Sequence, residues 1–156
     1  MNINIPNIKV PIIKNGSSDI ISLLDEFRNK KIILFGIPGA FTPTCSEEHF
    51  PGYIKLYNQI INKGIDSIYC LSVNDKYVMN SWLVSYSEEH KIYGIADGNA
   101  DITKHFNLIT DKSKNYMGIR SSRFAMVIEN NQVKEIKIEN PGELKVSTAD
   151  NILQNL

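Results

Sequence analysis

The sequence predicts an α/β protein in which a mixed β-sheet carries helices on both faces. Short apolar runs of strand length alternate with amphipathic stretches of helical spacing along most of the chain. The composition is that of a globular protein, with 42% hydrophobic and 22% charged residues. The 156 residues suit one compact core, so we expect a single domain spanning residues 1–156.

The first half of the chain predicts two buried strands and two helices. Residues 31–35 form a short, strongly apolar run that ends at Gly36, and residues 66–73 form a second run. Large apolar residues between them recur at helical spacing, and this helix is expected to end near Gly64. A second helix is predicted over residues 76–87.

The second half predicts a strand at residues 92–96, a short helix at 101–106 and a hairpin of strands at 124–129 and 133–138. A final helix covers residues 147–156, capped by Ser147 or Thr148. The weakly periodic stretch 107–122 is predicted as a loop and a possible wall of a functional site. This order of elements matches a thioredoxin-like layout.

The charge balance excludes some partners. There are 17 basic and 17 acidic residues, so no broad basic field is available for nucleic acid or an anionic membrane. The apolar runs are too short to span a bilayer, and the N-terminus lacks the pattern of a secretory signal. We therefore expect a cytoplasmic location, or an organellar one if a transit peptide has been removed.

The chain has two cysteines, Cys45 and Cys70. A structural disulfide is typical of secreted domains, whereas the lack of an export signal favours free thiols that are either packed or reactive. Without a nearby histidine cluster the pair makes a poor zinc site. We expect neither a metal nor a cofactor.

Cys45 lies where a helix is predicted to begin. Thr44 and Glu47 fit a capping box, and Thr42 followed by Pro43 at the first helical position is an alternative start. Both alternatives place Cys45 in the first turn, where unpaired N–H groups and the helix dipole favour a thiolate. From this pattern alone, a reactive cysteine and an inert buried cysteine are about equally plausible.

Cleavage of a peroxide bond needs a thiolate, hydrogen-bond donors and a nearby cation. The Thr42 hydroxyl is placed to donate to the peroxide or accept from it, and Pro38 to shield the sulfur from bulk water. Arg120 and Arg123 are the candidates for the cation.

The segment Pro38-Gly-Ala-Phe-Thr42-Pro-Thr-Cys45 resembles the active-site pattern of peroxiredoxins: Pro, three residues, Thr, two residues, Cys. Segments 49–53, 70–75, 120–126 and 146–153 resemble the atypical type II subfamily, also called the peroxiredoxin V group. The resemblance thus covers nearly the whole chain. It implies a thioredoxin-like fold and a thiol peroxidase for hydrogen peroxide and organic hydroperoxides, acting in antioxidant defence and redox homeostasis.

The resemblance assigns family roles to residues at matching positions. Cys45 matches the cysteine that the family oxidises to a sulfenic acid, and Thr42 and Pro38 match the other two motif positions. Arg123 matches the arginine that activates cysteine and peroxide, whereas Arg120 fits that role less well. His49, one helical turn beyond Cys45, is a candidate for lining the pocket. Members of this type are often homodimers with contacts near the active-site loops.

The sequence says less about how the Cys45 sulfenic acid is reduced back to the thiol. Some relatives carry a resolving cysteine near the C-terminus, and Val146 occupies the matching position here. Cys70 matches a second cysteine of type II relatives, but its apolar strand is more typical of an inert core residue, so its role as a resolving cysteine stays open. We favour an external thiol as reductant, glutathione with or without glutaredoxin, with thioredoxin second.

Three other functions compete with that of a peroxidase. A thiol–disulfide oxidoreductase would need a cysteine at the position of Thr42, which argues against it. A redox sensor or chaperone-like thiol switch would use Cys45 without efficient turnover. A scaffold without catalysis would leave peroxide consumption unchanged when Cys45 is replaced.

Overall fold

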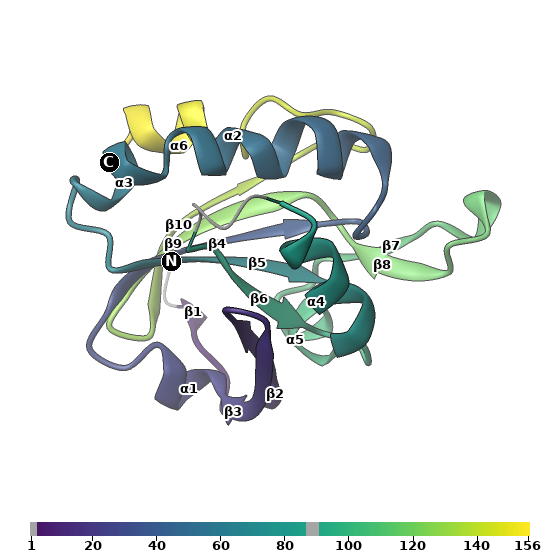
Figure 1. Cartoon of the computed structure of the whole chain (residues 1–156), viewed down its shortest axis with the longest axis horizontal. Coiled ribbons are helices and arrows are strands. Elements are labelled where there is room, and N and C mark those ends of the chain that lie inside the picture. Colours follow the sequence, from purple (N-terminus) through teal and green to yellow (C-terminus); the bar gives the residue numbers. More distant parts are fainter. Residues whose placement is uncertain (1–2, 87–90) are drawn as a thin grey trace.

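The computed structural model describes residues 3–86 and 91–156. Its sheet has eight strands in the order β1-β10-β9-β4-β5-β6-β2-β3, and β7 and β8 pair separately (Figure 1). The strands are β1 (Ile3–Asn4), β2 (Lys9–Lys14), β3 (Ser17–Ser22), β4 (Lys31–Ile37), β5 (Ser67–Ser72), β6 (Tyr93–Ala96), β7 (Ile109–Asp111), β8 (Ile119–Ser121), β9 (Phe124–Glu129) and β10 (Gln132–Ile138). The helices are α1 (Leu23–Glu26), α2 (Phe50–Lys55), α3 (Tyr57–Ile61), α4 (Lys76–Val84), α5 (Asp101–His105) and α6 (Ala149–Gln154), with a π-helical turn η1 (Cys45–His49) and a 3₁₀ turn η2 (Ser113–Asn115).

The sheet is mixed, as predicted. β4 lies near its centre and pairs in parallel with β5, which places Phe35 opposite Cys70. On its other edge β4 pairs antiparallel with β9, and β9 continues through a hairpin into β10. The two-residue connection Asn130-Asn131 has φ values of 51° and 62°, as a tight hairpin turn requires.

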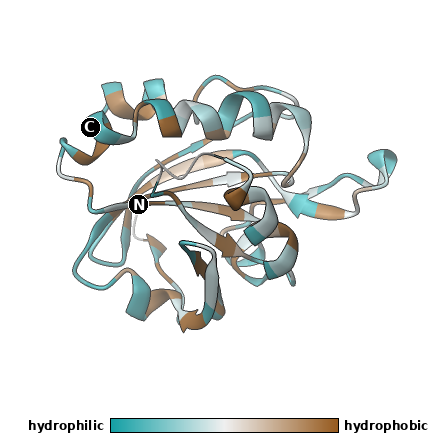
Figure 2. Ribbon diagram, in the orientation of Figure 1, coloured by the Kyte–Doolittle hydropathy of each residue, from teal (hydrophilic) through white to brown (hydrophobic). Residues whose placement is uncertain are grey.

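Helices cover both faces, which confirms the predicted layering. Side chains of β4 alternate between two cores: Phe35 packs on the side of α2, α3, α4 and α6, and Leu34 packs on the side of α1 and α5. In Figure 1, α2, α3 and α6 run along one side of the sheet and α1 lies on the opposite side. Figure 2 shows that the central strands are largely hydrophobic, as burial on both faces demands.

The N-terminal hairpin was not predicted. β2 and β3 are joined by Asn15-Gly16, whose φ values of 50° and 84° suit a two-residue turn. β2 also pairs with β6, through Ile12 and Ile13, and so extends the sheet at that edge. Pro11 lies within β2 and removes one hydrogen-bond donor, which weakens the strand signal in the sequence.

Several predicted bounds differ from the structure. Residues 107–122 form a projecting arm built from β7, η2 and β8 rather than an irregular loop (Figure 1). Helix α4 ends at Val84, and Ser87, the predicted end, lies outside the described residues. The last helix starts after Thr148, whose hydroxyl accepts from Asn151 N. In the described part of the chain, no helix has the length and apolarity needed to cross a membrane.

Candidate active site

The helix that carries Cys45 begins at Pro43, so the predicted Thr44 capping box is wrong and the alternative start is right. Thr44 has helical φ and ψ of −64° and −38° and makes no side-chain cap bond with any described residue. Ser46 N donates to Thr42 O at 2.9 Å, which closes the first turn. Cys45 therefore lies in that turn, at the start of η1, where the chain widens to π-helical hydrogen bonding.

Helix α4 and the residues just after it hold this turn from one side. Trp82 Nε1 donates to Ser46 Oγ at 2.9 Å, and Tyr86 OH donates to the Ser46 carbonyl at 2.7 Å. Both rings also pack against Phe50, with centroids 4.7 and 4.5 Å away. These contacts fix the backbone immediately after the cysteine.

The loop before the helix is held from two other places. Ala40 N donates to Asn74 Oδ1 at 3.0 Å. Arg120 donates to the Pro38 carbonyl at 3.4 Å and to Met117 O at 2.8 Å, so it joins this loop to the arm. A Cβ at Gly39 would lie 2.9 Å from Arg120 Nη1, so a side chain there would require the guanidinium to shift.

Thr42 presents an acceptor. Its hydroxyl donates to Gly39 O at 2.7 Å, so the proton is already engaged and the oxygen lone pairs remain for a ligand that donates. Of the two roles that the sequence leaves open for this hydroxyl, the geometry favours accepting.

The structure brings Arg123, not Arg120, to Cys45. Arg123 Nη2 donates to Cys45 Sγ at 3.3 Å, and Nη1 donates to His49 Nδ1 at 3.0 Å. Cys45 has no exposed surface and His49 is 1% exposed. A guanidinium that stays protonated in proteins thus faces a buried sulfur, an arrangement that stabilises negative charge on it.

His49 is held in one tautomer. Because Arg123 can only donate, Nδ1 must accept, and Nε2–H then donates to the Ser147 carbonyl at 3.0 Å. Burial lowers the pKa of His49 from 6.5 to about 4; the bond to Ser147 opposes this shift, and the charge of Arg123 adds to it. The imidazole is therefore neutral near neutral pH.

Glu139 is a buried carboxylate that the sequence analysis did not single out. Its Oε2 accepts from the backbone N–H groups of residues 145–147 and from Ser147 Oγ. Burial raises the pKa of Glu139, but hydrogen bonds from Ser147, Lys145 and Val146 outweigh it and the net shift is downward. No short-range pattern marks this residue, since its partners lie six to eight positions further along the chain.

Cys70 lies in the core on β5 with no exposed surface. Burial raises its pKa well above the ordinary value, the nearby Cys45 raises it further, and Arg123 acts in the opposite direction. In the described part of the chain both cysteines are free thiols. Cys70 is therefore a poor nucleophile in this conformation.

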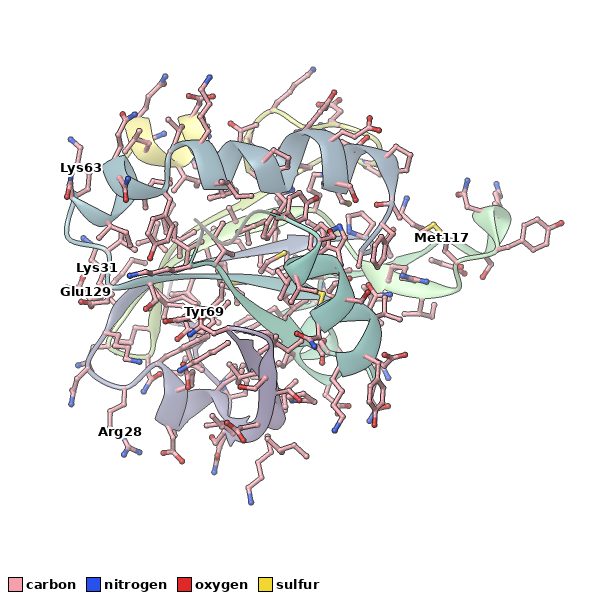
Figure 3. All side chains as sticks on the ribbon, in the orientation of Figure 1. Arg28, Lys31, Lys63, Tyr69, Met117 and Glu129 are labelled. Atoms are coloured by element: carbon pink, nitrogen blue, oxygen red, sulfur yellow. The ribbon has the colours of Figure 1, made fainter. Side chains whose placement is uncertain are left out.

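A cavity of about 280 Å³ lies against Thr44, the residue before Cys45, and against Arg123. Its walls include Pro38, Thr42 and Arg123, together with Thr110 and Met117 from the arm, so the stretch 107–122 does form part of the site wall. Figure 3 shows Met117 on the arm, between its tip and the body of the molecule. Among residues 3–86 and 91–156, no group of three or more His, Cys, Asp or Glu side chains is placed to hold a metal ion.

The fold and this site define a thioredoxin-like protein whose buried cysteine is paired with an arginine. The redoxin family model matches residues 4–153. Peroxiredoxin-2D of Arabidopsis thaliana is 43% identical over 143 residues, which cover 92% of this chain and 88% of that protein.

Two solved structures of similar proteins share the fold of this chain. Reduced Prx3 of Vibrio vulnificus in complex with H2O2 superposes with a TM-score of 0.91 at 39% identity, covering 98% of this chain and 96% of that one. The Plasmodium falciparum antioxidant protein, a 1-Cys peroxiredoxin, has a TM-score of 0.91 at 37% identity, covering 99% and 98%. The chain belongs to the redoxin family and is a type II peroxiredoxin, a thiol peroxidase.

Proposed function

We propose that this peroxidase reduces hydrogen peroxide and organic hydroperoxides through a sulfenic acid on Cys45. The observation that carries the proposal is the donation from Arg123 Nη2 to Cys45 Sγ at 3.3 Å. The cation favours the thiolate before the reaction and stabilises negative charge on the peroxide oxygens as the O–O bond breaks. The cavity beside Thr42 and Met117 leaves room for an organic substituent.

In the first step the thiolate attacks one peroxide oxygen. A new S–O bond forms, the O–O bond breaks, and the other oxygen leaves as hydroxide or alkoxide and takes a proton to give water or an alcohol. The Thr42 hydroxyl accepts the peroxide O–H and orients it, since its own proton is engaged by Gly39. Pro38 forms part of the wall that limits access of water.

An external thiol then returns Cys45 to its reduced form. It condenses with the sulfenic acid to a mixed disulfide and water, and a second thiol releases Cys45. Burial of Cys70 and the presence of Val146 where some relatives have a cysteine both support this one-cysteine cycle. The similar Plasmodium falciparum protein is named a 1-Cys peroxiredoxin. Glutathione, with or without glutaredoxin, is the favoured reductant and thioredoxin the second.

The test is turnover of purified protein supplied with peroxide and one reductant at a time. Cys45→Ser should abolish peroxide consumption, and a sulfenic-acid trapping reagent should label wild-type Cys45 after one equivalent of peroxide. Cys70→Ser should keep turnover with glutathione and glutaredoxin. Loss of turnover in Cys70→Ser would refute the one-cysteine cycle. Oxidation of Cys45 without turnover with any reductant would favour a redox switch instead.

A homodimer is part of the proposal. Phe41 is 57% exposed beside the active-site loop and Tyr77 is 76% exposed at the start of α4. Exposed aromatic side chains of this kind are typical of interface anchors. Sedimentation velocity should find a dimer for the wild type and a weaker one for Phe41→Ser; a wild-type monomer would refute it. A cytoplasmic or organellar location remains a prediction.

A further inference from the structure

Four hydrogen bonds converge on one oxygen of Glu139. Its Oε2 accepts from Lys145 N at 2.7 Å, from Val146 N and Ser147 N at 2.8 Å, and from Ser147 Oγ at 2.8 Å. The residue is 7% exposed. Three consecutive N–H groups can meet one carboxylate oxygen only if the backbone curls around it, so Glu139 fixes the conformation of residues 145–147.

This curl positions the Ser147 carbonyl. The carbonyl accepts from Tyr53 OH at 2.7 Å and from His49 Nε2 at 3.0 Å. His49 in turn accepts from Arg123, and Arg123 donates to Cys45. A continuous series of hydrogen bonds therefore runs from a carboxylate in the C-terminal segment to the sulfur.

We propose that Glu139 is a positioning residue. It holds the Ser147 carbonyl, so that the His49 proton stays on Nε2 and Nδ1 accepts from Arg123. That hydrogen bond keeps the Arg123 guanidinium directed at Cys45 Sγ. If the carbonyl moved, the imidazole proton would no longer be held at Nε2. A proton on Nδ1 would face the Arg123 N–H, and two donors would oppose each other. The proposal rests on the peroxidase function proposed above.

The backbone adds a second constraint from the same residue. Glu139 N donates to the Arg123 carbonyl at 2.9 Å. The main chains at residues 123 and 139 are thus tied together, beside strands β9 and β10. This bond survives substitution of the Glu139 side chain, so a variant at that position probes the carboxylate alone.

A purely electrostatic role and a positioning role of Glu139 predict opposite shifts in the pH midpoint of Cys45 alkylation for Glu139→Gln. Removing a nearby negative charge, by Coulomb's law alone, would favour the Cys45 thiolate and move its alkylation by iodoacetamide to lower pH. Loss of the aimed Arg123 would disfavour the thiolate and move the same midpoint to higher pH. The direction of the shift therefore separates the two effects.

The experiment uses the reduced full-length protein. For Glu139→Gln we expect the pH midpoint of Cys45 alkylation to rise, because part of the effect of the adjacent cation is lost. The rate constant for oxidation by hydrogen peroxide should fall roughly 10- to 100-fold, the range for a catalytic group displaced by up to ~1 Å. Glu135→Gln, which removes a β10 carboxylate paired with Lys137, is the charge-matched control and should change neither quantity. A midpoint unchanged or lower in Glu139→Gln would overturn the proposal.

A double-mutant cycle tests the route through the imidazole. In a His49→Gln background, adding Glu139→Gln should cause little further change in either quantity, whereas independent, multiplicative losses would refute this route. Ser147→Ala removes one of the four bonds to Glu139, together with the 3.4 Å contact between Ser147 Oγ and His49 Nε2, and is the variant to use if Glu139→Gln does not fold. It should raise the alkylation midpoint by a smaller amount, and a midpoint at or below the wild-type value would count against Glu139. Alkylation needs no peroxide, so it judges Glu139 even if the wild type shows no turnover.

Discussion

Protonation of His49 should control how the stability of this enzyme falls in mildly acidic solution. Burial lowers the pKa of this imidazole from 6.5 to about 4 in the folded protein. Between these values the unfolded chain binds a proton that the folded protein does not, so the free energy of unfolding falls as the pH falls. Each pH unit between these two pKa values lowers the free energy of unfolding by about 1.4 kcal/mol, which sums to about 3 kcal/mol over the whole interval.

The assay is urea unfolding of wild type and His49→Gln at several pH values between about 6 and about 4.5, a range inside this window. The substitution alters absolute stability, so the comparison uses the slope against pH. The wild type should lose about 1.4 kcal/mol more per pH unit than the variant, because glutamine does not titrate. Glu139, with its lowered pKa, also loses its contribution as pH falls, but this is common to both proteins. Equal slopes would show that the imidazole is not buried in its neutral form and would refute the reasoning.

Three further changes test local features by thermal or urea unfolding. Thr148→Ala should lower the free energy of unfolding by about 1 kcal/mol, because it removes a helix cap. Thr44→Ala lies inside a helical turn and should lower it by less than about 0.5 kcal/mol. Equal losses would contradict the assigned helix starts. Gly36→Ala should cost about 1–3 kcal/mol, because the new Cβ would lie 2.0 Å from Phe124 Cε1, and a neutral effect would show that the ring can move away. Trp82→Phe should cost about 1–3 kcal/mol, since it removes buried volume and the bond to the first helical turn, and an unchanged stability would show that this contact is dispensable.

The sequence predicted the elements whose signals are local and strong. The strands around residues 31–37 and 67–72 are continuous apolar runs, and the hairpin around Asn130-Asn131 has turn residues that tolerate positive φ. The N-terminal hairpin carried a comparable signal in Asn15-Gly16, but Pro11 within the first strand obscured it. Helix starts were ambiguous, since both Thr42 and Thr44 have side chains suited to capping.

The site was predictable as far as its motif extends. Pro38, Thr42 and Cys45 lie within eight positions, and Arg123 followed from resemblance; the structure places all four together with His49. Their catalytic roles remain predictions. Glu139 was missed because its importance depends on where the C-terminal segment folds, and a lone glutamate at a strand end has no distinctive pattern. The tautomer of His49 likewise follows only from its two partners.

The separation of Cys45 from Arg123 along the chain has a consequence during synthesis. The two residues that meet at the sulfur are 78 positions apart. Translation adds about 5–20 residues per second, so Arg123 is synthesised roughly 4–16 s after Cys45. During that interval the nascent thiol lacks the cation that we propose activates it. On that proposal, the fold delays activation of the nucleophile until most of the chain that must surround it exists.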